Sequence, residues 1–269
     1  MTSFAADWLA LREPYDGDAR NPDVLAVVAA TFGELPSVMV TDLACGTGST
    51  LRAISSHFPR RQTWRLADNN LSLLGRAASA QAGADIIINP MPVDLAHDLE
   101  AALDGPADLV TASALLDLVS AEWLERFVVE TSARRLPVYA ALTYDGRIYF
   151  DPADRFDAAI VEAVNRHQRR DKGFGPALGP TAAASAIAHF ETAGHSVVKG
   201  QADWIFTAED REIQNEVATG WATAAQETGD LARSEILEWL TRRRDFVAAG
   251  TSRMRVGHVD FFARPTGTL

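Results

Sequence analysis

The residues best suited to chemistry lie in the segment Val40–Leu51, where an apolar run ends in an acid and a glycine-rich turn follows. Gly46 and Gly48 have no Cβ atom, so a ligand can approach the main chain of this turn closely. Asp42 comes just before the turn, and a carboxylate there repels phosphate but attracts an ammonium group. The pattern predicts a small-ligand site at the end of a buried strand.

A second carboxylate, Asp68, ends the next predicted strand, 20 residues after Gly48. That separation suits a side chain that accepts hydrogen bonds from ribose hydroxyls, although an N-cap of the following helix is the alternative. Dinucleotide-binding turns need Gly or Ala where this chain has Leu51. A nicotinamide-dependent oxidoreductase is therefore disfavoured, and the chain shows no Tyr-x-x-x-Lys pair.

With these motifs the chain resembles the class I S-adenosylmethionine-dependent methyltransferases. Their first motif, (Asp or Glu)-x-Gly-x-Gly-x-Gly, corresponds to residues 42–48, with Ala44 in place of the first glycine. The segments Met91–Leu95 and Asp108–Asp117 look like the third and fourth motifs. The resemblance covers roughly residues 38–145. It implies a doubly wound α/β fold with seven mostly parallel strands, an antiparallel last strand and S-adenosyl-L-methionine as cofactor.

The resemblance also implies which residues hold the cofactor. Asp42 would face its amino-acid end, and Asp68 would hold the ribose hydroxyls with Asn69 beside the adenine. The other expected contacts are the main chain of Ala44, Gly46 and Gly48 at the methionine and ribose, Asp94 and Leu95 at the adenine edge, Ser113 at the pocket floor, and Arg20 or Arg12 at the methionine carboxylate. Asp94 as a simple loop carboxylate is the alternative at that position.

Methyl transfer from a sulfonium is an in-line displacement, in which the protein mainly aligns the nucleophile and excludes water. It needs no catalytic triad, and the chain shows none. For a hydroxyl nucleophile, His167 is the candidate base. Tyr144 and Asp145, at the end of the fifth predicted strand, are the other candidates. His258 lies within an apolar strand and is expected to be structural.

A basic cluster, Arg166–Lys172, precedes a segment with three glycines and two prolines, residues 173–180. Arg169, Arg170 and Lys172 predict a small, possibly anionic, substrate, and a solvated helix end is the alternative. The glycine-rich segment is typical of a lid or substrate loop. We expect one domain over residues 1–269, with a helical cap at 1–33 and a helical substrate-binding insertion at 146–195.

Composition limits the classes of partner. The chain has 269 residues, 47% hydrophobic and 23% charged, which is ordinary for a soluble enzyme. A net charge of −11 makes nucleic acid a poor partner, although an RNA methyltransferase acting through residues 165–172 stays an alternative. Neither a signal peptide nor a long apolar run is visible, so we expect a cytoplasmic protein without membrane contact. Cys45 is the single cysteine, and no spacing suits a metal.

Alternating strands and helices predict the doubly wound sheet. The expected strands are 37–43, 63–68, 84–89, 108–112, 137–143, 195–206 and 257–263, and the expected helices are 21–33, 48–57, 70–82, 98–103, one from Ser120, 151–172, 181–193, 209–227 and 231–249. Ile86, Ile87 and Ile88 predict a strand buried on both faces. Arg242–Arg244 predicts an exposed helix face. The protein is expected to be a monomer or homodimer, and a non-catalytic cofactor-binding regulator stays an alternative.

Overall fold

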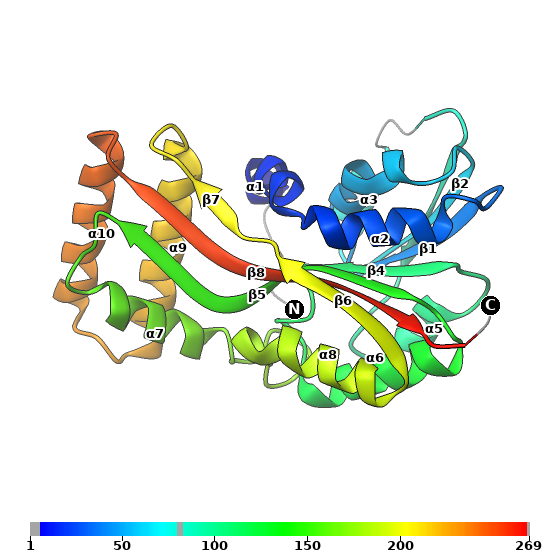
Figure 1. Cartoon of the computed structure of the whole chain (residues 1–269). Helices are drawn as coiled ribbons and strands as arrows, with labels where there is room; N and C mark the ends of the chain where they lie inside the picture. The colour runs from blue at the N-terminus through cyan, green and yellow to red at the C-terminus, as the bar shows by residue number, and fades with distance from the viewer. Residues whose placement is uncertain (1–5, 80–82, 268–269) are drawn as a thin grey trace.

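The computed structural model describes residues 6–79 and 83–267 (Figure 1). In this part of the chain, eight strands form one sheet, in the order β3-β2-β1-β4-β5-β8-β6, and β7 pairs with β8 off this path. The strands are β1 Val38–Leu43, β2 Gln62–Asp68, β3 Ile86–Pro92, β4 Leu109–Ser113, β5 Val138–Asp151, β6 His195–Gln201, β7 Trp204–Phe206 and β8 Arg253–Pro265.

The first five strands of this order run parallel, whereas β8 is antiparallel to both β5 and β6. The predicted antiparallel last strand is thereby confirmed. Asp42 pairs in register with Leu66 of β2 and with Thr111 of β4. Because parallel strands end at the same edge of the sheet, the turns after β1, β2 and β4 meet there. The strand order reverses at β1 and β4, where such sheets bind ligands.

Helices cover both faces of the sheet, as the predicted doubly wound fold requires (Figure 1). On one face lie α2 Pro22–Phe32, α3 Ser49–Ile54 and α4 Leu71–Ala78, whose apolar side chains pack around the buried Trp64. On the other lie α5 Leu99–Leu103, α6 Ala121–Ala133 and α8 Ala182–Thr192, packed around the buried Phe127 and Phe190. None of the described helices is both long and apolar enough to span a bilayer.

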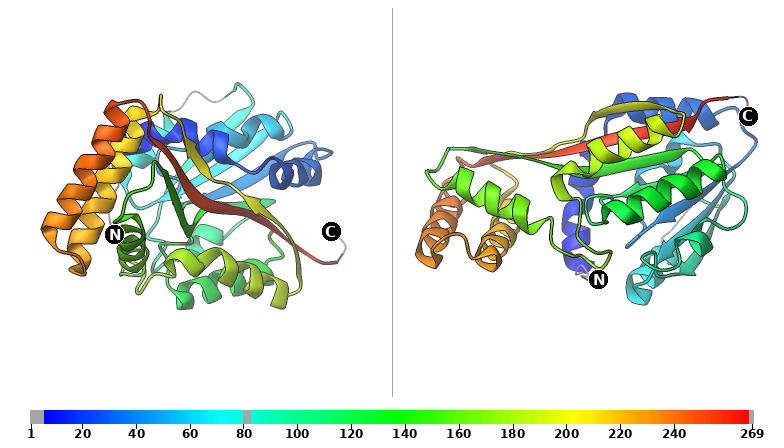
Figure 2. Two further views of the ribbon diagram at one scale, coloured as in Figure 1. Left: turned by 60° about the vertical axis from the view of Figure 1, so that its left-hand side comes forward. Right: turned by 90° about the horizontal axis from the view of Figure 1, so that it is seen from below.

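A second lobe forms where β5 and β8 run on past the central sheet (Figures 1 and 2). The helices α7 Asp157–His167, α9 Arg211–Thr228 and α10 Arg233–Ala248 pack on this extension around Trp239, and α1 Ala6–Ala19 lies beside β7. This lobe has its own apolar cluster. It faces the carboxyl edge of the central sheet and so closes the space above it.

Four predictions about individual elements need correction. The run at Ile86 is an edge strand, in which Ile87 is 60% exposed, because β2 is the only strand that β3 pairs with in the described part of the chain. The expected strand 195–206 divides into β6 and β7, which gives eight strands where seven were predicted. The expected helix over 151–172 is shorter, because α7 spans only Asp157–His167 and residue 151 still belongs to β5. Arg243 is buried and ion-paired with Asp157, so Arg242–Arg244 is not a uniformly exposed face.

Residues 1–5 of the expected cap and residues 80–82 of the expected second helix lie outside the described residues. The remainder of the cap comprises α1 and α2. The side chain of Asn21 accepts a hydrogen bond from the N–H of Val24 and so caps α2 as predicted. The expected insertion, 146–195, contains the end of β5, then α7, the glycine-rich segment and α8.

Candidate functional site

The turn after β1 adopts backbone conformations that bring its main chain to the surface of the site. Ala44, Gly46 and Gly48 all have positive φ, at 52°, 54° and 82°. Gly48 then serves as the N-cap of α3. The N–H of Cys45 donates to the carbonyl of Ala67, which ties the turn to β2 at 3.0 Å. Left-handed φ is unfavourable for alanine by roughly 1 kcal/mol, so the turn holds Ala44 in a strained conformation.

Asp68 holds the turn from the end of β2. Its Oδ2 accepts the N–H of Gly46 at 2.8 Å, and its Oδ1 accepts the N–H of Asn70 at 2.8 Å. The N-cap of α4 is Asn70, whose side chain accepts from Ser72 and Leu73. Asp68 is therefore not the helix cap that was the alternative. Each carboxylate oxygen has a further lone pair for a ligand hydroxyl.

Asp42 lies beneath the turn and is fully buried. Its Oδ1 accepts a hydrogen bond from Thr111 Oγ1 at 2.6 Å, and its Oδ2 has no partner among the described residues. Burial raises the pKa of this carboxyl to about 7, against the opposing effects of the Thr111 hydrogen bond and the charge of Arg20. Asp42 is therefore a buried acid beneath the turn that is only partly charged at pH 7.

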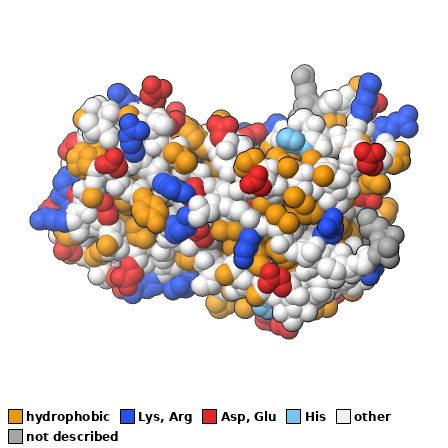
Figure 3. Space-filling model, in the orientation of Figure 1, with side chains coloured by type: hydrophobic (Ala, Val, Ile, Leu, Met, Phe, Trp, Pro, Cys, Tyr) orange, Lys and Arg blue, Asp and Glu red, His pale blue; other side chains and the backbone are white. Residues whose placement is uncertain are grey.

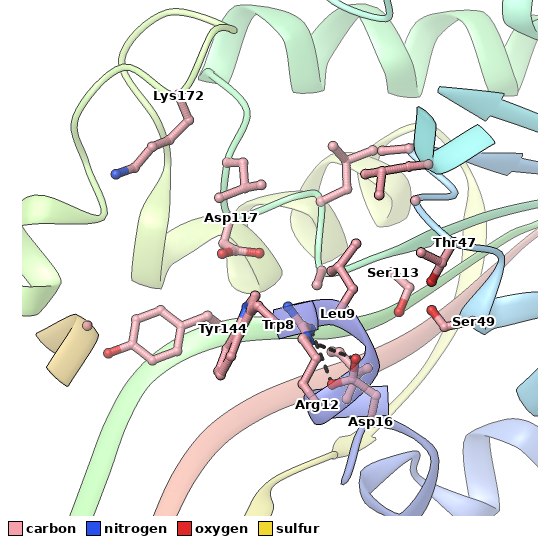
Figure 4. Close-up of a pocket in the computed structure, with 18 of the residues that line it drawn as sticks. Trp8, Leu9, Arg12, Asp16, Thr47, Ser49, Ser113, Asp117, Tyr144 and Lys172 are labelled. Atoms are coloured by element: carbon pink, nitrogen blue, oxygen red, sulfur yellow. Dashed lines mark hydrogen bonds and ion pairs between the residues drawn. The ribbon is translucent and has the colours of Figure 1, made fainter. Parts of the chain in front are cut away.

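A cavity of about 1120 Å³ extends from this turn into the second lobe (Figure 4). Its walls come from α1, from the turns after β1, β2 and β4, from β5 and β8, and from α7 and α9. It brings together ten of the residues predicted from sequence: Arg12, Ala44, Gly46, Asp68, Asn69, Leu95, Ser113, Tyr144, His167 and Lys172. The cofactor candidates line one end and the catalytic candidates line the other.

Other predicted cofactor residues do not line this cavity. Asp42 lies under the turn, and Gly48 packs against Ala77. Asp94 accepts the N–H of Ala96 at 3.0 Å and contacts His97, which is the loop role that was its alternative. Arg20 is buried behind the wall, with its guanidinium 3.3 Å from Ser113 Oγ.

Only part of the basic cluster Arg166–Lys172 lines the cavity. Arg169 is exposed, and Arg170 donates to the carbonyl of Glu227 at 2.7 Å, so neither lines the cavity. Asp145, a candidate base, instead accepts hydrogen bonds from the backbone and side chain of Arg147. Of the three predicted substrate-binding residues, only Lys172 reaches the cavity.

His167 and Lys172 form a chain of contacts with Glu227. Lys172 Nζ lies 3.3 Å from His167 Nδ1, and His167 Nε2 lies 2.9 Å from Glu227 Oε2. An ammonium only donates hydrogen bonds, so His167 Nδ1 accepts from Lys172. Nε2 of the same ring then carries the hydrogen and donates a hydrogen bond to Glu227. Partial burial lowers the pKa of Lys172. Because both ring nitrogens are engaged, His167 presents no free lone pair to the cavity.

Asp117 is a site residue that was not among the candidates. It is 6% exposed, lines the cavity and has no hydrogen-bond partner for Oδ1 within the described part of the chain. Burial raises its pKa to about 6. It lies in the loop after β4, and an acid at the carboxyl end of a parallel strand is the signal that could have found it.

Helix α1 forms a further wall, which includes Arg12, the residue predicted as the alternative to Arg20 at the methionine carboxylate. Asp16 accepts from Arg12 Nε at 2.8 Å and from Trp204 Nε1 at 2.9 Å. The Arg12 guanidinium lies over the Trp204 ring, 5.1 Å from its centre. His258 also lines the cavity, and burial lowers its pKa to about 3, so it is neutral at pH 7.

No family model matches the chain, and no curated protein matches it. The cyclopropane synthase MmaA2 from Mycobacterium tuberculosis aligns at a TM-score of 0.51 and 9% identity, over 97% of this chain and 95% of its own. A cyclopropane-fatty-acyl-phospholipid synthase-like protein from Lactobacillus casei aligns at 0.51 and 14%, over 94% and 98%. A candidate methyltransferase from Bacillus halodurans aligns at 0.50 and 14%, over 91% and 100%. With this likeness and this strand order, the chain has the fold of the class I S-adenosylmethionine-dependent methyltransferases.

Proposed function

We propose that the protein transfers a methyl group from S-adenosyl-L-methionine to an oxygen or nitrogen nucleophile of a small molecule. The observation that carries this proposal is the single cavity that joins the glycine turn to the second lobe. At about 1120 Å³ it exceeds the range of roughly 300–1,000 Å³ that one drug-sized ligand occupies. It has room for a cofactor and an acceptor side by side, as a direct transfer between them needs.

The residues at the turn fit this cofactor better than a dinucleotide. Asp68 places a carboxylate at the turn, which suits ribose hydroxyls and opposes a diphosphate, and the partly protonated Asp42 lies beneath it. A Cβ added at Gly46 would make ordinary van der Waals contact with Leu9 Cδ1, at 3.6 Å, so Leu9 of α1 lies over the bare main chain at this edge of the cavity. Asp68 would hold the ribose hydroxyls, and the main chain of Ala44 and Gly46 would line the methionine portion.

When bound, the cofactor supplies a methyl carbon activated by its positively charged sulfur. The chain's own residues then position the acceptor and exclude water. Leu9 and Trp8 of α1 cover the cavity from one side, and Val164 of α7 and Trp221 of α9 close it from the other. This enclosure supports a transfer to a small molecule that is surrounded by protein.

The solved neighbours do not identify the acceptor. Two of the three carry cyclopropane synthase names, but a fold hosts many chemistries and their identity to this chain is 9% and 14%. The side chains of the second lobe are the part of the molecule that indicates the acceptor. Those side chains support a small molecule over a lipid surface or a polymer, because the cavity passes between α1, α7 and α9.

RNA as the acceptor has less support. Arg166 pairs with Asp230 at 3.0 Å and Arg170 pairs with Glu227, so much of the basic cluster is already neutralised. Figure 3 shows basic and acidic side chains interspersed over the second lobe on the face drawn. Phosphate contacts dominate RNA affinity, and a chain with net charge −11 opposes them.

Two measurements test the proposed function. Thermal shift and isothermal titration calorimetry with S-adenosylmethionine, S-adenosylhomocysteine and NAD should show binding of the first two and not of NAD. Methyl release across a panel of metabolites then separates an enzyme from a non-catalytic cofactor binder. Stabilisation by NAD alone would favour the oxidoreductase alternative, and salt-sensitive retention of RNA would favour an RNA substrate.

A further inference from the structure

We propose that the second-lobe end of the cavity binds a neutral, ring-bearing molecule with a hydroxyl group, and that Asp117 accepts the proton of that hydroxyl. This inference rests on the proposed methyl transfer and specifies its acceptor. It comes from the walls of the chamber and from one unpartnered carboxylate oxygen. We define the acceptor chamber as the part of the cavity lined by Trp8, Tyr144, Val164, Trp204, Trp221 and Val256.

The walls of the acceptor chamber are aromatic and apolar. Four aromatic side chains line it from four elements: Trp8 from α1, Tyr144 from β5, Trp204 from β7 and Trp221 from α9. Aromatic faces pack against ring systems and contribute apolar area with little conformational entropy loss. Figure 4 draws Trp8 and Tyr144 below Asp117, and the rings of Trp8 and Trp204 lie 6.4 Å apart, centre to centre. Glu216, Thr219 and Thr223 of α9 also line the cavity, so the aromatic faces suit a planar ring that carries a polar group.

Asp117 provides the polar contact for the acceptor. Its carboxylate is directed into the cavity between Lys172 and Tyr144 (Figure 4). The side chain is more than nine-tenths buried, and its Oδ1 has no donor among the described residues. A buried acceptor without a donor costs free energy, so a ligand that brings an O–H group to Oδ1 relieves that cost.

The cations near Asp117 already have partners. Arg12 is held by Asp16, and Lys172 is in contact with His167. An anionic acceptor would compete with these pairs and would meet the carboxylate of Asp117. A protonated amine would be repelled by the positive charges of Arg12 and Lys172, both of which lie close enough to lower the pKa of Asp117. A neutral hydroxyl avoids both penalties, so the chamber favours it over the anionic substrate predicted from the basic cluster.

In the proposed methyl transfer, the hydroxyl oxygen forms a bond to the methyl carbon while the carbon–sulfur bond breaks. The electron pair of the broken bond stays on sulfur. The hydroxyl proton passes to Asp117, which later releases it to water. Tyr144 cannot replace Asp117 as base at neutral pH, because burial and the charges of Asp145 and Asp117 raise its pKa further. Its hydroxyl also donates to Asn165 at 2.6 Å.

The binding test uses three naphthalene probes on the full chain saturated with S-adenosylhomocysteine: 2-naphthol, 2-naphthoate and 2-naphthylmethylammonium. Calorimetry should show 2-naphthol binding at least about tenfold more tightly than either charged probe. In Asp117→Leu the preference for 2-naphthol should disappear, while S-adenosylhomocysteine affinity stays within about twofold of the wild type. Glu34→Gln, which changes an exposed acid outside the cavity, is the control and should change neither affinity.

A second variant covers the case in which Asp117→Leu does not fold. Asp117→Asn keeps the shape and an acceptor oxygen but cannot take a proton, so it should still bind 2-naphthol and lose about a hundredfold in methyl transfer to a hydroxyl substrate. If S-adenosylhomocysteine binds but a charged probe is preferred, or if Asp117→Asn keeps full transfer, the inference is wrong and the proposed function stands. If S-adenosylhomocysteine does not bind at all, the proposed function itself is wrong.

Discussion

The carboxylate of Asp68 accepts the backbone N–H of Gly46 at 2.8 Å, so the residue that ends β2 holds the turn that follows β1. The same carboxylate lines the cavity. One side chain therefore fixes the turn and offers lone pairs to a ribose. Changes at Asp68 should act on the cofactor site through both routes.

Replacing Asp68 should weaken cofactor binding. We expect Asp68→Ala to lose at least about tenfold in S-adenosylhomocysteine affinity, because both the ribose contact and the hydrogen bond to Gly46 disappear. Asp68→Asn keeps an oxygen for Gly46 and should lose less. Isothermal titration measures both, with Glu34→Gln as the control. Unchanged affinity in Asp68→Ala would remove this residue from the site.

The strained turn predicts an unusual response to glycine. Ala44→Gly removes the strain of a φ of 52°, and this gain offsets the larger unfolded-state entropy of glycine. We expect the free energy of unfolding to stay unchanged or rise by up to about 1 kcal/mol. Ala188→Gly, at an exposed position inside α8, should lose about 1 kcal/mol in the same urea titration. Equal losses in the two variants would show that the turn is not strained.

Much of the cofactor end could be predicted from sequence because it depends on local patterns. A glycine turn after an apolar strand and an acid at the end of the next strand are both readable within one segment. Parallel pairing then brings Ala44, Asp68 and Ser113 to one edge. Asp42 belongs to the same pattern, but its place beneath the turn depends on β1 lying between β2 and β4.

The acceptor end could not be predicted in the same way because it depends on contacts between distant segments. Trp204 donates to Asp16 across 188 residues of sequence, and His167 meets Glu227 across 60. The polar sequence of α1 and its internal Pro14 gave no separate helix signal, so the expected cap at 1–33 did not locate the helix that carries Asp16. Nothing local distinguishes the exposed Arg169 from Lys172 three residues later, which lines the cavity.

The buried acids predict how stability changes with pH. In the folded protein the pKa of Asp42 is about 7 and that of Asp117 is about 6, both above the value of 3.8 for an ordinary Asp. A raised carboxyl pKa means that the folded state holds its proton longer, so this stabilisation is fully present only below pH 3.8 and is lost as pH rises to about 7. We expect Asp42→Asn to reduce this fall, by an amount on the order of 2–4 kcal/mol.

Urea unfolding of the ligand-free protein between pH 4.5 and about 8 measures this effect. The Asn side chain keeps an oxygen for Thr111, so the variant tests the charge rather than the hydrogen bond. A wild-type protein that becomes more stable between pH 5 and about 7, or an Asp42→Asn curve with the same slope, would contradict the assignment of a raised pKa.

The ion pair inside the second lobe should matter more than pairs on its surface. Asp157 accepts from Arg243 at 2.8 Å and from Trp239 Nε1 at 2.8 Å, and Arg243 is 1% exposed. Asp157→Ala leaves this guanidinium buried without its partner, so we expect a loss of about 3 kcal/mol or more in the free energy of unfolding. Glu238→Ala removes an exposed partner of Arg155 and of Arg242, which keeps Asp154, and should lose under about 1 kcal/mol. Similar losses in the two variants would show that the lobe does not depend on the buried pair.

The most direct test of the account is a crystal structure of the protein grown with S-adenosylhomocysteine. We predict that the ligand lies against Ala44 and Gly46, with its ribose hydroxyls on Asp68 and its sulfur directed toward the acceptor chamber and Asp117. Crystals that form at saturating ligand but leave this cavity empty, or that hold the ligand with its ribose away from Asp68, would contradict the account.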